Sequence, residues 1–217
     1  MGALGQVRAI QPHPKRRKHV ILVIEGSEDL TVHEDVVVAL GLSAGTPLSA
    51  ETLRSIATQA QVVRATQAAS AQLAHRPRSR QELVRSLRQK GFDDGVAEQA
   101  LAKLEKLGFI NDARFARDLA QSLCRRNTGR RAIVYKLQKS GVSDELIQEA
   151  VAEVLEDVDD TERALEALQK RLGKWRGLPA MKRRAKSYQL LARLGFDADT
   201  IADVLRIALV DETHAQG

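Results

Sequence analysis

Cysteine and aromatic residues are scarce in this 217-residue sequence, which has one cysteine, one tryptophan, two tyrosines and four phenylalanines. The single cysteine, Cys124, cannot form a disulfide within the chain, which excludes a disulfide-stabilised secreted domain. No apolar run approaches the ~20 residues that a membrane-spanning helix needs, and the N-terminus has no signal-peptide hydrophobic segment. We therefore expect a cytoplasmic protein with no membrane partner, in which Cys124 is a half-buried structural thiol.

Residues that bind metals or activate nucleophiles are not clustered either. None of the five histidines pairs with a histidine or cysteine at the spacing of zinc ligands. The glycine-rich segments 41–45 and 173–177 lack the spacing of a phosphate-binding loop or a nucleophile elbow. The acids Asp157, Asp159 and Asp160 are explained by a helix N-terminus, whose dipole attracts negative charge. We predict that the protein is not an enzyme and binds no metal or cofactor.

The residues that are abundant favour helices and positive charge. Alanine, leucine, arginine and glutamine are common, and these residue types form helices more readily than sheets. Lysine and arginine number 34 against 28 aspartate and glutamate residues, a formal net charge of +6. This excess suits association with a polyanion.

The N-terminal region differs from the rest of the chain. β-Branched stretches at 7–10 and 19–24 are separated by two prolines and the basic run 15–18, which is the pattern of a β-hairpin. Residues 30–32 are long enough for a short third strand. We predict that residues 1–48 form a small β-hairpin region closed by a short helix.

Helix start and stop signals then follow in order. Thr31 and Glu34 have the spacing of a capping box, and Gly41 is a stop signal, which predicts the short helix. A long segment rich in alanine and glutamine runs from Ser49 to His75, where an Arg-Pro pair interrupts it. From Ser49 onward the sequence predicts only helices.

A repeat of about fifty residues organises the rest of the chain. It is anchored on Gly91, Gly141 and Gly195, each followed by an apolar residue and then a helix-capping type. A leucine stands four positions before each glycine and an arginine eleven positions before it, namely Leu87, Leu137, Leu191, Arg80, Arg130 and Arg184. Apolar residues recur at helical spacing after each glycine, and a further amphipathic helix separates the copies. Each repeat is therefore predicted to have three helices.

The predicted fold class is mainly α: three tandem three-helix repeats in an elongated array, preceded by the small N-terminal β-hairpin region. The repeats are expected at residues 49–108, 109–157 and 158–217, the last with a C-terminal tail. Units of this size bury only a modest core alone, so neighbouring units are expected to stack.

Basic residues cluster at the matching place in each repeat, between its first and second helix. The third cluster also surrounds Trp175. Any one cluster is more often a solvated helix face than a site, but three at matching positions favour a continuous stripe that binds a phosphate backbone or an acidic protein groove. Base-specific recognition is not expected, because few side chains suit it and stacking platforms are absent. The candidate binding residues are Arg78, Arg80, Arg85, Arg88, Arg125, Arg126, Arg130, Arg131, Lys182, Arg183 and Arg184.

The amino-acid sequence of the repeats resembles that of the RecX regulatory family over about residues 50 to 210. The segment Arg78-Ser79-Arg80-Gln81-Glu82-Leu83 with Lys90-Gly91-Phe92 resembles the family's first repeat, and Gly108-Phe109-Ile110-Asn111-Asp112 resembles its most distinctive segment. The match continues through Gly129, Leu137, Gly141-Val142, Tyr188, Leu191, Arg193, Gly195-Phe196 and Ile201. Leu194 departs from the family, where a basic residue is usual.

This resemblance implies a protein that binds the helical groove of RecA filaments on DNA and restrains their recombinase, ATPase and co-protease activities. It also implies weak, sequence-neutral binding to single- or double-stranded DNA, and we expect a monomer. The principal alternative is a helical DNA-binding module that acts without RecA, and a small nuclease is a distant third. The two main hypotheses differ in whether tight DNA binding needs RecA.

Some residues are expected to have structural roles instead. Phe92, Phe109, Phe115 and Phe196 are predicted to be core residues. Asp112 either caps the helix that contains Arg114 or contacts a partner.

Overall fold

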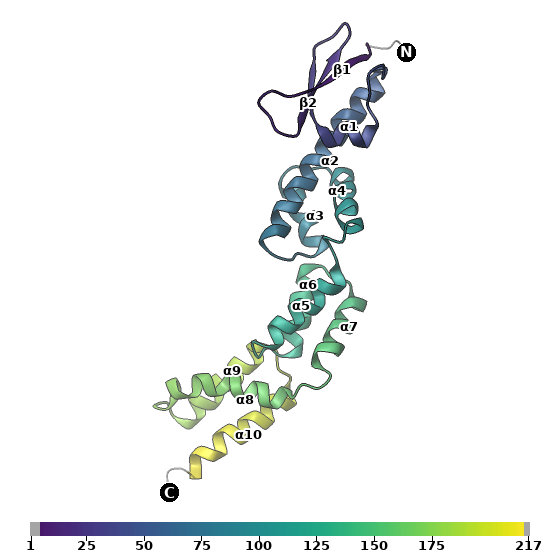
Figure 1. Cartoon of the computed structure of the whole chain (residues 1–217). Coiled ribbons are helices and arrows are strands. Elements are labelled where there is room, and N and C mark those ends of the chain that lie inside the picture. Colours follow the sequence, from purple (N-terminus) through teal and green to yellow (C-terminus); the bar gives the residue numbers. More distant parts are fainter. Residues whose placement is uncertain (1–4, 215–217) are drawn as a thin grey trace. The chain divides into compact units, whose positions relative to one another are not determined.

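The computed structural model describes the backbone of residues 5–214 and the side chains of residues 5–208. Helices predominate in this part of the chain, and the strands form one small N-terminal sheet (Figure 1). The chain divides into two compact units. The first unit comprises the residues up to Arg78 together with Glu82–Ile110, and the second comprises Ser79–Gln81 together with the residues from Asn111 onward.

The first unit begins with an antiparallel sheet of strands β1 (Val7–Pro12), β2 (His19–Ile24) and β3 (Leu30–His33), paired in that order. This confirms the predicted hairpin and the short third strand. Alternate apolar residues of these strands enter a small core with the helix α1 (Glu34–Leu40).

The predicted start signal of α1 was wrong by two residues. Thr31 lies within β3, paired with Ile21, and cannot cap a helix there. His33 is the N-cap instead, and its Nδ1 atom accepts a hydrogen bond of 3.2 Å from the Asp35 amide. The stop signal is confirmed, since Gly41 ends α1 with a left-handed φ of 60°.

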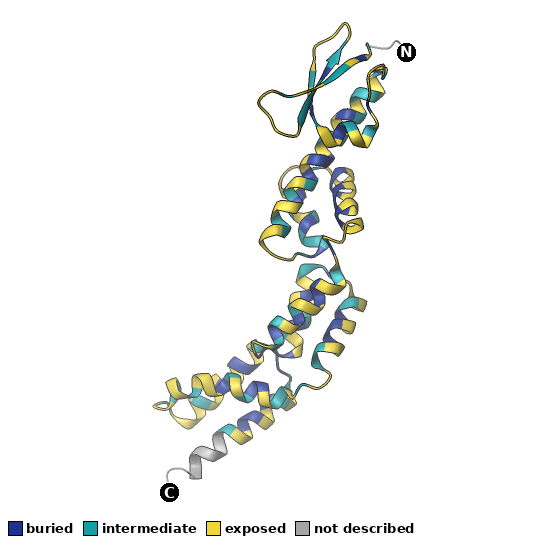
Figure 2. Ribbon diagram, in the orientation of Figure 1, coloured by how far each residue is buried: buried dark blue, intermediate teal, exposed yellow. Residues whose placement is uncertain are grey.

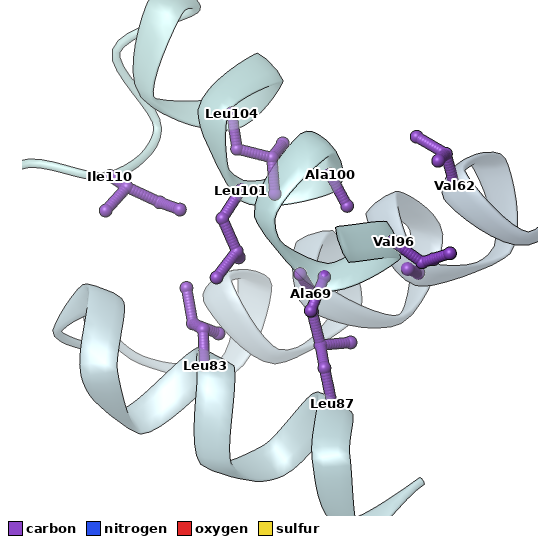
Figure 3. Close-up of a cluster of buried hydrophobic side chains, with 11 residues drawn as sticks. Val62, Ala69, Leu83, Leu87, Val96, Ala100, Leu101, Leu104 and Ile110 are labelled. Carbon is purple, nitrogen blue, oxygen red and sulfur yellow. The ribbon is translucent and has the colours of Figure 1, made fainter. Parts of the chain in front are cut away.

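The long helix α2 (Ala50–His75) serves two cores within the first unit. Its Ile56 and Val63 side chains enter the core beneath the sheet. Its second half packs with α3 (Arg80–Gln89) and α4 (Asp94–Lys106) to form the core of the first repeat. Figure 3 shows how Leu83 and Leu87 approach the side chains of the facing helices. The domain limits at residues 48, 108 and 157 stay predictions.

The second unit contains six α-helices among the described residues that follow Asn111. The second repeat consists of α5 (Asp112–Cys124), α6 (Arg130–Ser140) and α7 (Asp144–Leu155). The third repeat consists of α8 (Asp160–Leu172), the short 3-10 helix η1 (Gly173–Trp175), α9 (Ala180–Leu194) and α10 (Ala198–His214). Each repeat has its own cluster of buried apolar residues, visible as blue stripes along the helices in Figure 2. Cys124 is half-buried against the core of the second repeat, as predicted.

The three glycine turns are the same turn in the structure. Gly91, Gly141 and Gly195 have φ values of 82°, 79° and 88°, a conformation that side chains disfavour. The amide of the residue after each glycine donates to the carbonyl of the leucine four positions before the glycine, at 3.2–3.3 Å. All three leucines are fully buried. The repeat read from the sequence is therefore a repeat of helix-terminating turns.

One expectation about a single residue was wrong, and one of the two alternatives for another residue is excluded. Phe109 is 64% exposed, because the left-handed turn at Gly108 aims Ile110 into the core in its place; Ile110 is only 4% exposed. Asp112 does not cap its own helix, since Asn111 accepts the hydrogen bond from the Arg114 amide. The Asp112 carboxylate instead accepts a hydrogen bond of 2.8 Å from the Arg80 amide at the start of α3.

Candidate polyanion-binding surface

The first set of predicted binding residues lies beside and within α3, and part of its charge is already engaged. Arg88 forms an ion pair of 2.5 Å with Asp94. Arg78 is half-buried, and its Nε atom is buried without a hydrogen-bond partner among the described residues. Arg80 is also half-buried, which leaves Arg85 and Arg88 as the exposed members. This set therefore offers less free positive charge than its sequence suggests.

The second set is more open. Arg125 and Arg126 follow α5, and Arg130 and Arg131 begin α6. All four side chains are exposed, and none forms an ion pair within the part of the chain that the structure describes. A solvated guanidinium without a local carboxylate is available to an external anion.

Cations stand at the unfavourable end of two helices. The first turns of α6 and α9 contain no acidic residue, whereas those of α4, α5, α7 and α8 all do. Neither α6 nor α9 has a side-chain cap at its N-terminus. The helix dipole is positive at this end. An acid there would stabilise the helix by about 0.3–1 kcal/mol, and a cation there destabilises it by a similar amount. An anionic partner would remove this cost.

The start of α6 is held firmly by the third repeat. The Gly129 amide donates to the Leu194 carbonyl at 2.8 Å, and the Arg131 amide donates to the Gly195 carbonyl at 3.1 Å. A Cβ atom on Gly129 would lie 2.4 Å from the Gly195 carbonyl carbon and the Phe196 nitrogen. This close backbone contact fixes the second set relative to the turn between α9 and α10.

A buried arginine that was not predicted from the sequence stabilises the loop between α5 and α6. Arg163 in α8 is 9% exposed, and its guanidinium donates to the carbonyls of Thr128 and Cys124 and to the Asp160 carboxylate. It also lies 5.8 Å from the centre of the Phe196 ring. The only signal in the sequence is its place beside the apolar stripe of α8, next to Ala164. Arg163 is thus a structural cation, not a member of the exposed surface.

Asn127 stabilises the loop between α5 and α6 through a second contact. Its side-chain amide donates to the Glu166 carboxylate at 3.0 Å. This hydrogen bond and then the charge of Lys170 lower the pKa of Glu166. The acid at this junction is therefore held in its charged form by local partners.

The third set begins α9, but it does not match the other sets turn for turn. Lys182 and Arg184 are exposed, while Arg183 is half-buried. Arg80 and Arg130 are the first residues of their helices, whereas α9 starts at Ala180 and places Arg184 one turn further in. Each of the three arginines stands eleven residues before its glycine, but the three do not occupy the same position in their helices. A single stripe through all three sets stays a prediction.

The basic run at residues 15–18 forms a surface that sequence reasoning noted only as a loop. The loop is closed by the amide of His13, which donates to the His19 carbonyl at 2.9 Å. The Nδ1 atom of His13 accepts hydrogen bonds from the amides of Lys15 and Arg16. The side chains of the run are exposed. An ordered hairpin tip thus presents consecutive cations.

The described residues contain neither a metal-binding cluster nor a membrane-spanning helix. No group of three or more histidine, cysteine, aspartate or glutamate side chains is placed to hold a metal ion. No helix in that range is long and apolar enough to cross a membrane. Asp159, one of the acids assigned to a helix N-terminus, caps α8 by accepting from the amides of Thr161 and Glu162.

The fold and the exposed cations together define a protein of three-helix repeats that presents basic surfaces. Family models match these repeats one by one: the first, second and third three-helix domains of RecX at residues 65–104, 111–151 and 157–205. The chain belongs to the RecX family, a family of regulatory proteins known as regulators of RecA.

Several relatives support this assignment. The regulatory protein RecX of Chlorobaculum tepidum is 35% identical over 65% of this chain and 86% of its own length. That of Geobacillus kaustophilus is 30% identical over 94% of this chain and 77% of its own length. A crystal structure of a regulatory protein RecX has the same fold, with a TM-score of 0.78 over 93% of this chain and 98% of that chain, at 23% identity. RecX from Lactobacillus salivarius matches with a TM-score of 0.57 over 67% of this chain, at 22% identity.

Proposed function

We propose that this protein binds RecA, or the RecA filament on DNA, and restrains its recombinase, ATPase and co-protease activities without catalysing a reaction. The observation that carries the proposal is the unpaired positive charge at the start of α6, on a surface fixed by the junction of two repeats. Cations at the positive end of α6 lower the stability of the helix, and no contact within the described part of the fold compensates for this. Such a destabilising arrangement favours a role in binding. Membership of the RecX family supplies RecA as the partner.

DNA contributes weakly in this proposal. Exposed arginines and lysines bind phosphates without reading bases, so the contact with DNA is sequence-neutral and sensitive to salt. The protein acts as a monomer in the cytoplasm.

The test is the ATPase activity of RecA on single-stranded DNA, measured against increasing concentrations of this protein. We expect the parent protein to lower ATP turnover. The variant Arg130→Glu with Arg131→Glu should need about tenfold more protein for the same effect, since about 1.4 kcal/mol of binding free energy corresponds to a factor of ten.

A matched control is available in the first repeat. Lys103→Glu with Lys106→Glu reverses two exposed cations of α4 that form no ion pair within the described residues. This control should inhibit RecA as the parent does. If neither the parent nor the control changes ATP turnover, the proposal is wrong. Tight binding of the parent to DNA without RecA would favour the DNA-binding module instead.

A further inference from the structure

A hollow of about 420 Å³ lies in the third repeat, between η1 with the end of α8 on one side and α9 on the other. Four cations line it: Arg171, Lys174, Lys186 and Arg193. None of the described residues that line it is acidic. The four side chains are exposed and form no ion pair within the described part of the chain. Four like charges around one hollow repel each other until an anion enters.

The hollow also contains Trp175, the only tryptophan of the chain. The indole is half-buried, and it packs against the core of the third repeat. The ammonium group of Lys186 lies 6.0 Å from the centre of the indole ring. The core therefore holds the ring in place. The cation beside the ring is the end group of the long Lys186 side chain.

Helix geometry brings these groups to one place. Lys186, Gln189 and Arg193 are spaced by three and four residues and share one face of α9. Arg171 and Lys174 are three residues apart where α8 passes into η1. Cations thus reach the hollow both from the end of α8 with η1 and from α9, with the side-chain amide of Gln189 among them.

We propose that this hollow binds a nucleotide unit of a single-stranded nucleic acid, with the base against Trp175 and its flanking phosphates held by the four cations. This departs from the expectation, drawn from the sequence, that stacking platforms are absent. An aromatic ring beside a basic track suits an unpaired base and its backbone, and stacking accepts any base. An acidic peptide would use the cations but not the indole. In a duplex the base faces are covered by their neighbours, so the ring has nothing to stack on. The binding needs no RecA. It rests on the DNA contact of the proposed function and deepens it, because it names a single-stranded ligand and the residues that hold it.

The single tryptophan makes the test direct, because all indole fluorescence of the protein comes from this hollow. The probe is a twelve-residue oligothymidylate added to the whole protein at low salt. We expect it to quench the fluorescence in a saturable way, and to bind at least about tenfold more tightly than free thymidine triphosphate, because several phosphates are held at once. A duplex of the same length and polyglutamate should quench much less.

Substitutions test the two components separately. Lys174→Gln with Lys186→Gln should weaken quenching by the oligonucleotide about tenfold, and Lys103→Gln with Lys106→Gln should leave it unchanged. Binding of a labelled oligonucleotide should weaken about tenfold in Trp175→Ala and be largely retained in Trp175→Phe, which keeps a stacking ring. Circular dichroism checks that each variant is folded.

The outcomes separate this proposal from others. Absent quenching by the oligonucleotide, or quenching that the double lysine variant does not weaken, would overturn it. Equal affinity for thymidine triphosphate would make the hollow a mononucleotide site, and equal quenching by polyglutamate would make it an acidic-peptide site; both overturn the proposal. RecA ATP turnover measured in parallel tests the regulatory function independently, since either result can hold while the other fails.

Discussion

Gly129 stands at the start of α6 against the turn at Gly195, where the backbone leaves no room for a side chain. Its φ is not left-handed, so the need for glycine comes from close approach alone. Gly195 faces the reciprocal constraint, because a Cβ atom there would lie 2.4 Å from the Ala132 nitrogen. Both contacts are with backbone atoms, which cannot rotate away.

Gly129→Ala should therefore lower the free energy of unfolding by about 1–3 kcal/mol, the usual cost of overpacking. Urea unfolding followed by circular dichroism measures this. Gly95→Ala is the matched control: Gly95 lies within α4 with nothing within 4 Å of the added Cβ, so it should gain up to about 1 kcal/mol. An unchanged midpoint for Gly129→Ala would show that the two repeats do not need this contact.

Among the helices, α6 and α9 differ from their neighbours in the charge of their first turns. The other helices of the second and third repeats begin with acids, and α7 and α8 also have side-chain caps. The N-cap residues of α6 and α9 are Gly129 and Pro179, which have no side-chain oxygen to offer. These two helices start with less electrostatic support than the fold could give them.

Reversing this charge should raise stability while it lowers binding. Arg130→Glu with Arg131→Glu places acids at the positive end of α6, a gain of about 0.3–1 kcal/mol for each favourable charge. For a chain of this length, each kcal/mol raises the thermal midpoint by about 2–4 °C. Differential scanning calorimetry measures the shift.

The control variant Lys103→Glu with Lys106→Glu should change the thermal midpoint in the opposite direction. Lys103 and Lys106 lie in the last turn of α4, where cations are favourable, so their reversal to glutamate should lower the midpoint. The dipole argument is wrong if the arginine variant melts below the parent.

Over the whole molecule, the buried apolar residues form separate clusters, each built from a short stretch of the chain. The core of the third repeat uses residues between Ala164 and Leu205, and that of the first repeat uses residues between Val62 and Ile110. Repeat proteins of this kind are stabilised by local cores and by contacts between sequence neighbours. Damage to one core should remain largely local.

Leu191→Ala tests this locality. The side chain is fully buried, so its truncation should cost about 2–5 kcal/mol. Amide hydrogen exchange should show the loss of protection mainly in α8, α9 and α10. Leu83→Ala, at an equally buried leucine of the first repeat, should produce the loss in α2, α3 and α4 instead. Equal loss of protection along the whole chain after either change would contradict separate cores.

Local signals in the sequence were enough to determine most of the elements. Glycines that need a left-handed φ, such as Gly91 and Gly141, and caps such as Ser49 and Ser143 act within a few residues of themselves. For this reason the strands, the long helix and the recurring turns were predicted correctly. The wrong assignments, Thr31 and Phe109, are residues whose role depends on strand pairing or on which of two neighbours a turn buries.

The sequence by itself determined the repeat, the family resemblance and the position of each basic set, because spacing and charge are properties of the chain alone. Tertiary structure decided which cations are free: Arg88 is paired with Asp94, and Arg163 is buried against Thr128, while Arg130 and Arg131 stay exposed. It also brought Trp175 together with cations from α8 and α9. Pairing, burial and convergence depend on distances between residues of different helices, and only packing sets those distances.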